Sequence, residues 1–208
     1  MTRRSRIGLT LFAGLLLALG VGVLTAQGTS KALAPCGAGG PGTIYDDHEV
    51  RVFEKEQGAE VRTVVCSHIN GHRYRIAHYP VDGLSRAVDI VSAPGRYLGY
   101  SVLLAGNGGS LTGKACVLRL KDGERSCTSG QQVLGLGATR KGSLAWLAYD
   151  RLDEENGLVC CAVYEREWEA AKAAKLDSGP DIEKGTFAVG GNRIYWTKAG
   201  EPKSATMP

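Results

Sequence analysis

The sequence has 208 residues, of which 43% are hydrophobic, and its 25 Lys and Arg residues against 21 Asp and Glu residues give a formal net charge of +4. Three of these positive charges lie in residues 1–28, which contain no acid, so the rest of the chain carries only +1. A net charge this small implies no basic face for nucleic acids. The length is enough for one domain with its own core.

Residues 1–28 have the parts of an export signal. Three arginines within the first six residues precede an uncharged apolar run of 18 residues from Ile7 to Leu24, and residues 26–28 resemble a signal-peptidase site. We therefore expect a secreted or cell-envelope protein with a cleaved signal peptide. The run is intermediate in length between a signal-peptide core and a membrane span, so an uncleaved anchor is the alternative, and only this alternative predicts membrane attachment.

A weak repeat runs through the rest of the chain. The segments Gly95–Tyr100, Gly142–Trp146 and Gly191–Trp196 share a glycine turn, an apolar residue, a small or aromatic residue and a closing aromatic residue. The closing aromatics are 46 and 50 residues apart, a period typical of propeller blades and other stacked units. We therefore divide the mature chain into a flexible N-terminus at 29–43 and a single β-propeller-like domain at 44–208.

Predicted strands surround each copy of the repeat. Val88–Val91, Val133–Leu136 and Thr186–Val189 precede the glycine turns, and Ala115–Leu120 and Leu158–Tyr164 follow a loop in the two complete copies. Their apolar and β-branched residues favour strands. With a return strand, each copy makes a four-stranded antiparallel meander. The sequence therefore predicts an all-β fold of about four blade-like units, which is a small or partial β-propeller.

The two ends of the domain contain incomplete copies. Glu60–Cys66 and Arg73–Ile76 read as a hairpin, and Asn70-Gly71 predicts a two-residue turn between its strands. The last copy stops after Glu201–Met207 and has no return strand of its own. An early strand at 43–45 is a candidate for that position, where it would close the ring.

Residues 165–175 depart from this scheme. They are rich in strong helix formers and place Glu169 and Lys172 on one helical face, although the repeat requires a return strand at this point. We expect a short helix or a helical bulge here, at the edge of a blade.

The aromatic-ended segments, together with Leu176–Gly179 before the last copy, resemble small secreted bacterial proteins built from TolB-like and WD40-like β-propeller blades. The resemblance covers residues 44–207, but the chain lacks the Gly-His and Trp-Asp signatures of true WD40 repeats. It implies a propeller-like fold and a general binding role. It transfers no catalytic residue and no cofactor to this chain.

An even number of cysteines in a chain that we expect to be exported favours disulfide bonds among Cys36, Cys66, Cys116, Cys127, Cys160 and Cys161. We favour a bridge from Cys36 to Cys66, which would tie the mature N-terminus to the first hairpin. Cys116 and Cys127 flank a hairpin turn and could bridge locally. Cys160 and Cys161 alternate across the faces of a strand, so a bridge between them would be strained, and at least one should point into the core.

No cofactor is predicted, and no metal site has a complete set of ligands. The acidic loop with Asp150, Asp153, Glu154 and Asn156 could bind calcium, but it breaks the alternation of ligands that an EF-hand-type loop has. A solvated hairpin tip is the simpler interpretation. The two histidines within Cys66–His72 lie on opposite faces of the predicted hairpin, so we do not expect them to share a zinc ion.

We expect a non-enzymatic module that binds an extracytoplasmic protein or another envelope component. Ala105–Lys114 and Asp150–Gly157 join the same pair of strands in successive copies, so they should lie on one rim and form the binding surface. An extracytoplasmic hydrolase or lyase on a propeller scaffold is one alternative, although no nucleophile with partners can be assigned. An envelope-anchored structural protein, which requires an uncleaved leader, is the other.

Overall fold

The computed structural model of this chain describes residue 36 and residues 42–81, 86–92, 95–105, 111–130, 132–153 and 157–208. Within these strands, only the backbone is described for residues 86–92, 105, 111, 151–153 and 157–159. The predicted export signal and most of the predicted flexible N-terminus lie outside the described residues. Ala32–Pro208 form one compact unit. In the described part of the chain, no helix is long and apolar enough to span a membrane.

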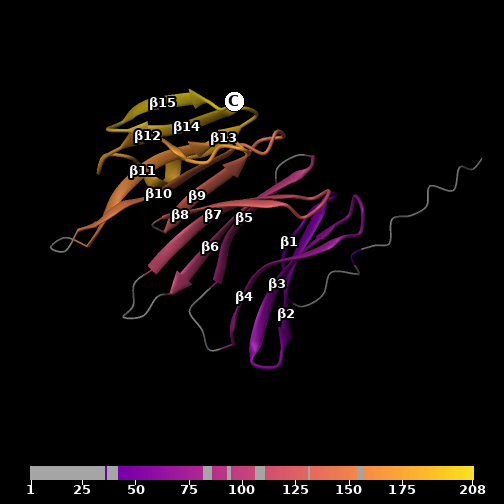
Figure 1. Cartoon of the computed structure of the whole chain (residues 1–208). Helices are drawn as coiled ribbons and strands as arrows, with labels where there is room; N and C mark the ends of the chain where they lie inside the picture. Colours follow the sequence, from indigo (N-terminus) through magenta and orange to yellow (C-terminus); the bar gives the residue numbers. More distant parts are fainter. Residues whose placement is uncertain are drawn as a thin grey trace, which may run out of the picture. The chain divides into compact units, whose positions relative to one another are not determined.

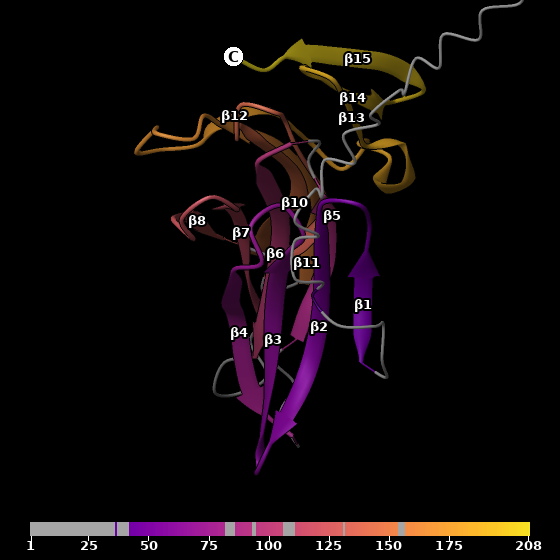
Figure 2. The ribbon, with the colours of Figure 1, turned by 90° about the vertical axis from the view of Figure 1, so that its right-hand side faces the viewer.

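The described residues form four antiparallel sheets that follow one another along the chain (Figures 1 and 2). Sheet A contains β1 (Thr43–Asp46), β2 (Val50–Gln57), β3 (Glu60–Ser67) and β4 (Arg73–Pro80). Sheet B contains β5 (Arg86–Ser92), β6 (Tyr97–Ala105), β7 (Leu111–Arg119) and β8 (Arg125–Gly130). Sheet C contains β9 (Val133–Ala138), β10 (Leu144–Asp153), β11 (Gly157–Arg166) and β12 (Ala174–Ser178). A short 3-10 helix, η2 (Lys184–Thr186), precedes sheet D, which contains β13 (Ala188–Gly190), β14 (Arg193–Lys198) and β15 (Glu201–Thr206). Strands that are consecutive in the chain are neighbours in every sheet, so the predicted antiparallel meanders are confirmed.

Hydrophobic cores lie between successive sheets, and strand β10 shows how. Leu144, Trp146 and Ala148 belong to the core that sheet C shares with sheet B, whereas Ala145 and Leu147 belong to the core that it shares with sheet D. Because both faces of this strand are covered, all five residues are buried. The strand therefore reads as a continuous apolar run and not as an alternating pattern.

The closing aromatics of the repeat occupy equivalent positions. Tyr100, Trp146 and Trp196 lie on the second strands of sheets B, C and D, and each is buried between its own sheet and the preceding one. All three are at most 7% exposed. The residue two positions earlier in each strand points into the same core, because alternate residues of a strand share a face. The repeat in the sequence is thus a repeat of buried positions in successive sheets.

The expectation that an early strand completes the last copy is wrong. β1 pairs with β2, with Tyr45 opposite Val52, so it completes sheet A and leaves sheet D with three described strands. Pairing two strands that are adjacent in the chain closes a short loop, which costs little conformational entropy. Pairing β1 with β15 would close a loop of almost the whole domain, which costs more. Sheet A is therefore a full four-stranded unit and not an incomplete copy.

The predicted two-residue turn at Asn70-Gly71 is also wrong. Cys66 pairs with Arg73, and the longer loop between them is closed by a hydrogen bond from Ser67 N to the carbonyl of His72. The Asn70 side chain donates a hydrogen bond of 2.8 Å to the carbonyl of Leu120 in sheet B. A contact with another sheet, and not local turn preference alone, therefore determines this loop.

The expected helix at 165–175 is wrong as well. β11 continues to Arg166, a turn follows, and β12 returns beside β11. In that turn the Trp168 ring lies 5.2 Å from the Tyr97 ring, measured between centroids, and the Arg119 guanidinium lies over it. Helix propensity differs among residues by only a few tenths of a kcal/mol, so ladder hydrogen bonds and the packing of Trp168 outweigh it.

Disulfide bonds join all six cysteines in the pairs Cys36–Cys66, Cys116–Cys127 and Cys160–Cys161. The first two pairs confirm the prediction, and such bonds are compatible with an extracytoplasmic location. The third contradicts the expectation from strand alternation. The pairing register between β10 and β11 skips Cys161, so a β-bulge interrupts the alternation at that point. Cys161 is fully buried, as expected for at least one of the two.

Candidate functional site

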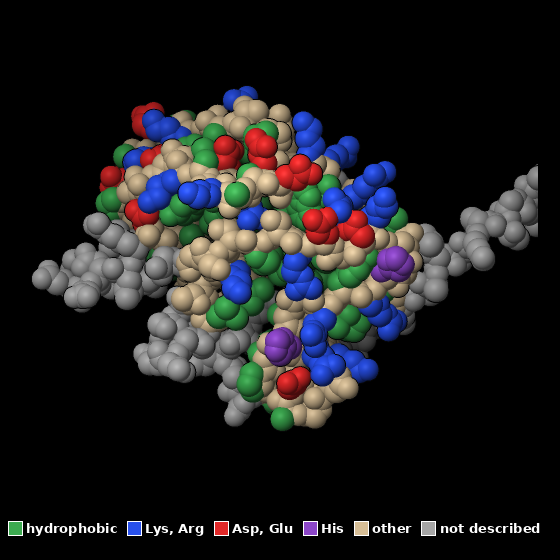
Figure 3. Space-filling model, in the orientation of Figure 1, with side chains coloured by type: hydrophobic (Ala, Val, Ile, Leu, Met, Phe, Trp, Pro, Cys, Tyr) green, Lys and Arg blue, Asp and Glu red, His purple; other side chains and the backbone are tan. Residues whose placement is uncertain are grey.

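The turns after the first strands of the four sheets lie at one edge of the molecule, which we call the turn edge. Their described residues are 47–49, 95–96, 139–143 and 191–192. Cavities lined from two or more of these turns show that turns of different sheets lie together. Figure 3 shows Lys and Arg side chains along the side on which these turns lie in Figure 1.

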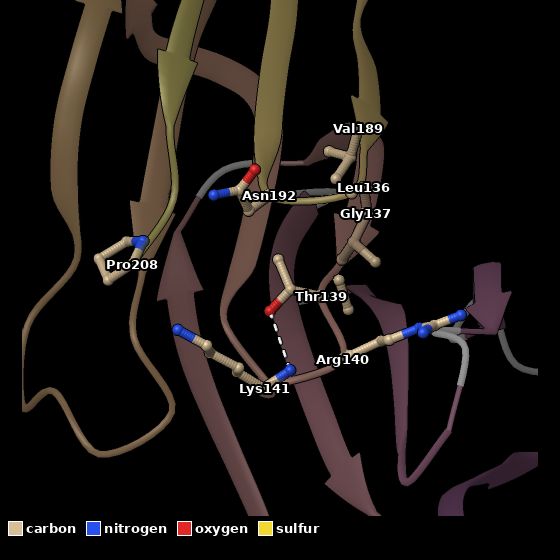
Figure 4. A pocket seen from close by; sticks show the side chains of 10 residues that line it. Leu136, Gly137, Thr139, Arg140, Lys141, Val189, Asn192 and Pro208 are labelled. Atoms are coloured by element: carbon tan, nitrogen blue, oxygen red, sulfur yellow. Dashed lines mark hydrogen bonds between the residues drawn. The ribbon is translucent and has the colours of Figure 1, made fainter.

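Three cavities adjoin one another along the turn edge. The basic cavity has a volume of about 710 Å³ and is lined by residues of three sheets, among them His48, Glu49, Arg96, Tyr97, Arg140 and Lys141. The apolar cavity, of about 620 Å³, has Leu136, Ala138 and Val189 on its wall and shares Arg140 and Lys141 with the basic cavity (Figure 4). The third cavity, of about 310 Å³, shares Arg96 with the basic cavity and is completed by Ile69, Asn70, Leu120 and Lys121.

The turn at 139–143, which carries the shared cations of the first two cavities, is held by its own hydrogen bonds. Thr139 Oγ1 accepts hydrogen bonds from two backbone N–H groups of the turn, at 3.1 and 3.3 Å. Gly142 has a φ of +87°, and a Cβ at this position would lie 2.8 Å from the Tyr97 ring of sheet B. Glycine is therefore required both by the backbone conformation and by the close approach of the ring. Contacts within the chain thus hold the conformation of this turn.

The acid of the basic cavity, Glu49, is engaged in joining two sheets. Both of its carboxylate oxygens accept a hydrogen bond from Gly95 N, at 2.9 and 2.7 Å. Asp47 Oδ1 in turn accepts a hydrogen bond of 2.8 Å from Glu49 N, which fixes the turn that carries the acid. His48 Nε2 lies 3.6 Å from Glu49 Oε1, and the His48 side chain is 86% exposed. The first turns of sheets A and B are thus held together by Glu49.

Replacing Glu49 with alanine should lower the free energy of unfolding by about 1–3 kcal/mol, because Gly95 N then loses its acceptor. Urea titration measures the loss, and hydrogen exchange should show faster exchange at the Gly95 amide. Glu56→Ala is the matched control, because Glu56 is an exposed acid of the same sheet. Equal stability of the two variants would show that Glu49 does not join the turns.

The cations that line these cavities differ from Glu49, because their side chains have no partner among the described residues. Arg96, Arg140 and Lys141 are exposed, and within the described residues their side chains make no ion pair or hydrogen bond. Elsewhere Arg119 and Lys198 are held by acids of their own or a neighbouring sheet. Figure 4 shows Arg140 and Lys141 extending from the turn in different directions, with Lys141 on the side of Pro208. The turn edge therefore offers positive charge at several separate points.

Of the residues proposed from the sequence for calcium, Asp150 is the one whose side chain is described. Asp150 accepts a hydrogen bond from Lys175 Nζ and lies 3.5 Å from the Tyr164 hydroxyl. Only the backbone of Asp153 is described, and residues 154–156 lie outside the described part of the chain. Among the described residues, no group of three or more His, Cys, Asp and Glu side chains is arranged to hold a metal ion.

The loops proposed as the binding rim leave their strands at the ends opposite the turn edge. Residues 106–110 and 154–156, which form most of these connections, lie outside the described residues. Because the flanking strands are nine or ten residues long, the two edges are about 30 Å apart. The described cavities and the predicted rim are therefore separate surfaces.

The two histidines considered for zinc have different partners. His68 Nε2 lies 3.2 Å from Asp46 Oδ1, and His72 Nδ1 lies 3.1 Å from the Tyr74 hydroxyl. A hydrogen bond from Arg51 holds the pKa of Asp46 below its ordinary value against the effect of burial, and His68 contributes in the same direction. The two histidines thus belong to two separate groups of polar side chains on sheet A.

Sequence reasoning did not single out the cations of the turn edge. Arg96 follows Gly95, and Arg140 and Lys141 precede Gly142, so a cation adjoins the turn glycine in two successive copies of the repeat. That recurrence was the available signal. A cation beside a turn glycine is common in any solvated turn, so this signal alone does not indicate a site. Only the stacking of the sheets brings the cations to adjoining cavities.

No protein-family model and no curated protein matches the sequence. Among solved structures, the chain is similar to the uncharacterized protein lmo1340 of Listeria monocytogenes EGD-e, with a TM-score of 0.41 and 9% sequence identity. The match covers 77% of this chain and 51% of that protein, so the chain spans about half of its length. A similarity of this size assigns the chain to no family and carries no argument about its function.

Proposed function

We propose that this chain is an exported, β-propeller-like binding module without catalytic activity, and that its ligand binds at the turn edge. The observation that carries the proposal is the row of three adjoining cavities, to which turns of all four sheets contribute. Concave sites between repeated units are typical of proteins that bind their ligands on a rigid scaffold. The expected partner is an extracytoplasmic protein or another envelope component.

The arrangement of the sheets supports the propeller-like interpretation. Each sheet is an antiparallel meander, each shares a core with the next, and the second strands carry their aromatics at equivalent positions. In a propeller, such blades direct the turns between their first two strands to one face of the ring. This arrangement produces cavities between the first turns of neighbouring sheets.

The composition of the cavities favours binding over hydrolysis or elimination. A hydrolase or lyase would place two carboxylates, or a histidine with an acid, where they can act on a substrate. Among the described residues that line the three cavities, His48 and Glu49 are the one pair of this kind. Both Glu49 oxygens already accept a hydrogen bond from Gly95 N, and the His48 side chain, 3.6 Å away, is 86% exposed. The remaining polar side chains are mostly cations and amides, which bind anions and hydroxyl groups.

The decisive experiment compares the two edges of the molecule. The immobilised mature chain is incubated with a cell-envelope fraction of the source organism, and the retained material is quantified. The variant Arg140→Gln/Lys141→Gln should retain at most about one tenth of the material, because charge-assisted contacts are lost at both shared positions. Exchange of residues 106–110 and 154–156 of the predicted rim loops for short Gly-Ser turns, which keeps strands β6, β7, β10 and β11 intact, should leave retention unchanged.

The matched control is Lys172→Gln/Lys203→Gln, which removes the same charge from exposed positions outside the cavities. This control should retain as much material as the unsubstituted chain. If exchange of the two loops abolishes retention and the turn-edge variant does not, the ligand binds at the opposite rim and the turn-edge proposal is wrong.

A further inference from the structure

Free cations recur at the boundaries between successive cavities of the turn edge. Arg140 and Lys141 lie between the apolar and the basic cavity, and Arg96 lies between the basic and the third cavity. All three are exposed and have no side-chain partner within the described residues. Lys121 continues the row in the third cavity. Positive charge thus follows the cavities as a series.

The directions of these side chains exclude a single small anion as the ligand of the whole row. Arg140 and Lys141 leave adjacent positions of one turn but extend in different directions (Figure 4). Arg96 comes from the turn of another sheet. A ligand that contacts all three cations must carry negative groups at several points. Its single contacts are weak, but their contributions to the affinity add up.

The size and the walls of the cavities indicate the size and chemistry of the rest of the ligand. Volumes of about 710, 620 and 310 Å³ are each within or near the range of sites for small molecules, and the cavities adjoin, so an elongated ligand fits them. The apolar wall of Leu136, Ala138 and Val189 offers a surface for C–H groups, and Asn192 offers an amide beside it. A protein partner would be expected to insert an aromatic anchor into a deep pocket, and these cavities are open.

We propose that the ligand of the turn edge is an acidic polysaccharide, a linear chain of sugars with repeated carboxylate or sulfate groups. Its anionic groups contact Arg96, Arg140 and Lys141, and the rings between them lie in the cavities. This inference rests on the proposed function, because it names the ligand class of the same site. An extracytoplasmic polymer of this kind is also one form of the envelope component expected from the sequence.

Isothermal titration calorimetry of the mature chain tests the ligand class. The probes are polygalacturonate for repeated carboxylates, dextran sulfate for repeated sulfates, neutral dextran, monomeric galacturonate and duplex DNA. We expect one acidic polysaccharide to bind, neutral dextran not to bind, and galacturonate to bind at least about a hundredfold more weakly than its polymer. The first two probes decide which anionic group is preferred.

Variants connect that binding to the turn edge. Arg96→Gln/Arg140→Gln/Lys141→Gln should weaken binding of the preferred polymer at least about tenfold, since three exposed charge contacts are lost. Lys172→Gln/Lys203→Gln, which removes charge elsewhere, should change the affinity less than about twofold. Near-ultraviolet circular dichroism shows whether the triple variant keeps the native fold, as expected for exposed side chains.

Three results would overturn the inference: equal binding of neutral dextran, equal binding of duplex DNA, or equal binding of monomeric galacturonate. If no acidic polysaccharide binds while retention of envelope material still depends on Arg140 and Lys141, the ligand class is wrong and the proposed function stands. If retention depends on the opposite rim, the proposed function itself is wrong.

Discussion

Replacing Trp146 with alanine should lower the free energy of unfolding by about 3–5 kcal/mol, the range for a buried aromatic in a core. Trp146 is 5% exposed and belongs to the core between sheets B and C. Its ring stacks on that of Tyr164, with centroids 5.3 Å apart and an interplanar angle of 14°. The variant would leave a cavity in the core between sheets B and C. Both sheets depend on this core, because no single sheet can bury its faces alone.

Urea unfolding followed by fluorescence and circular dichroism measures this loss. Tyr195→Ala is the matched control, because Tyr195 lies on the second strand of sheet D but is 43% exposed on the opposite face from Trp196. We expect it to cost less than about 1 kcal/mol. If Trp146→Ala does not fold, Trp146→Phe keeps most of the buried ring and allows the comparison. A loss below 1 kcal/mol for Trp146→Ala would show that the cores between sheets do not hold the fold together.

Replacing Asp177 with alanine should lower the free energy of unfolding by about 2–4 kcal/mol at neutral pH, because the indole N–H of Trp196 and the ammonium group of Lys198 lose their acceptor. Asp177 on β12 accepts hydrogen bonds from Lys198 Nζ at 2.6 Å and from Trp196 Nε1 at 3.0 Å. Both donors belong to sheet D. The carboxylate therefore links sheets C and D beside their shared core.

The same contacts make this link sensitive to acid. Burial raises the pKa of Asp177, but the hydrogen bonds from Lys198, Trp196 and Ser178 N more than offset it, so the pKa lies below its ordinary value of 3.8. A carboxyl whose pKa is lower in the folded state adds stability above the unfolded-state pKa. That stability is lost as the pH falls through the folded pKa. The loss should therefore begin below about pH 4.

Urea titrations at pH 7 and at successive values below pH 4 test both parts of this prediction. The unsubstituted protein should lose stability over the acidic range, and Asp177→Ala should lose less over the same range because it starts without the link. Asp181→Ala, at an exposed acid in the connection between β12 and sheet D, should cost less than about 0.5 kcal/mol at pH 7. Identical pH profiles with and without Asp177 would contradict the proposed link.

Local patterns were enough to predict the turns and the second strands of the repeat. Glycine before a short apolar and aromatic segment marks the turn and the second strand in three copies, and Tyr100, Trp146 and Trp196 occupy the equivalent buried positions that this pattern indicated. The reason is that backbone freedom at glycine and the burial of alternate residues are encoded within a few residues of each other. Two disulfide pairs followed from the same hairpins.

Other features depended on neighbours that are distant in the sequence. Asn70 lies in a longer loop, where its side chain donates a hydrogen bond to the carbonyl of Leu120. Residues 165–175 form the end of β11, a turn and the start of β12, and Trp168 in that turn packs against Tyr97. The bond between Cys160 and Cys161 depends on a bulge in the register of β10 and β11. Local propensity is worth less than these tertiary contacts, so it is overruled where they form.

The sequence by itself determined an all-β chain of repeated meanders, with an export signal and disulfides as its expected context. Only the tertiary structure decided which turns lie together. Arg96 and Arg140 are solvated turn residues of different repeats, and neither is distinguished by its own surroundings in the chain. They become parts of one surface because the packing of apolar faces stacks the sheets and brings equivalent turns to the same edge. The apolar residues that form the cores can be recognised from local sequence. Their burial determines where the polar turn residues lie, and the grouping of those polar residues cannot be recognised from local sequence.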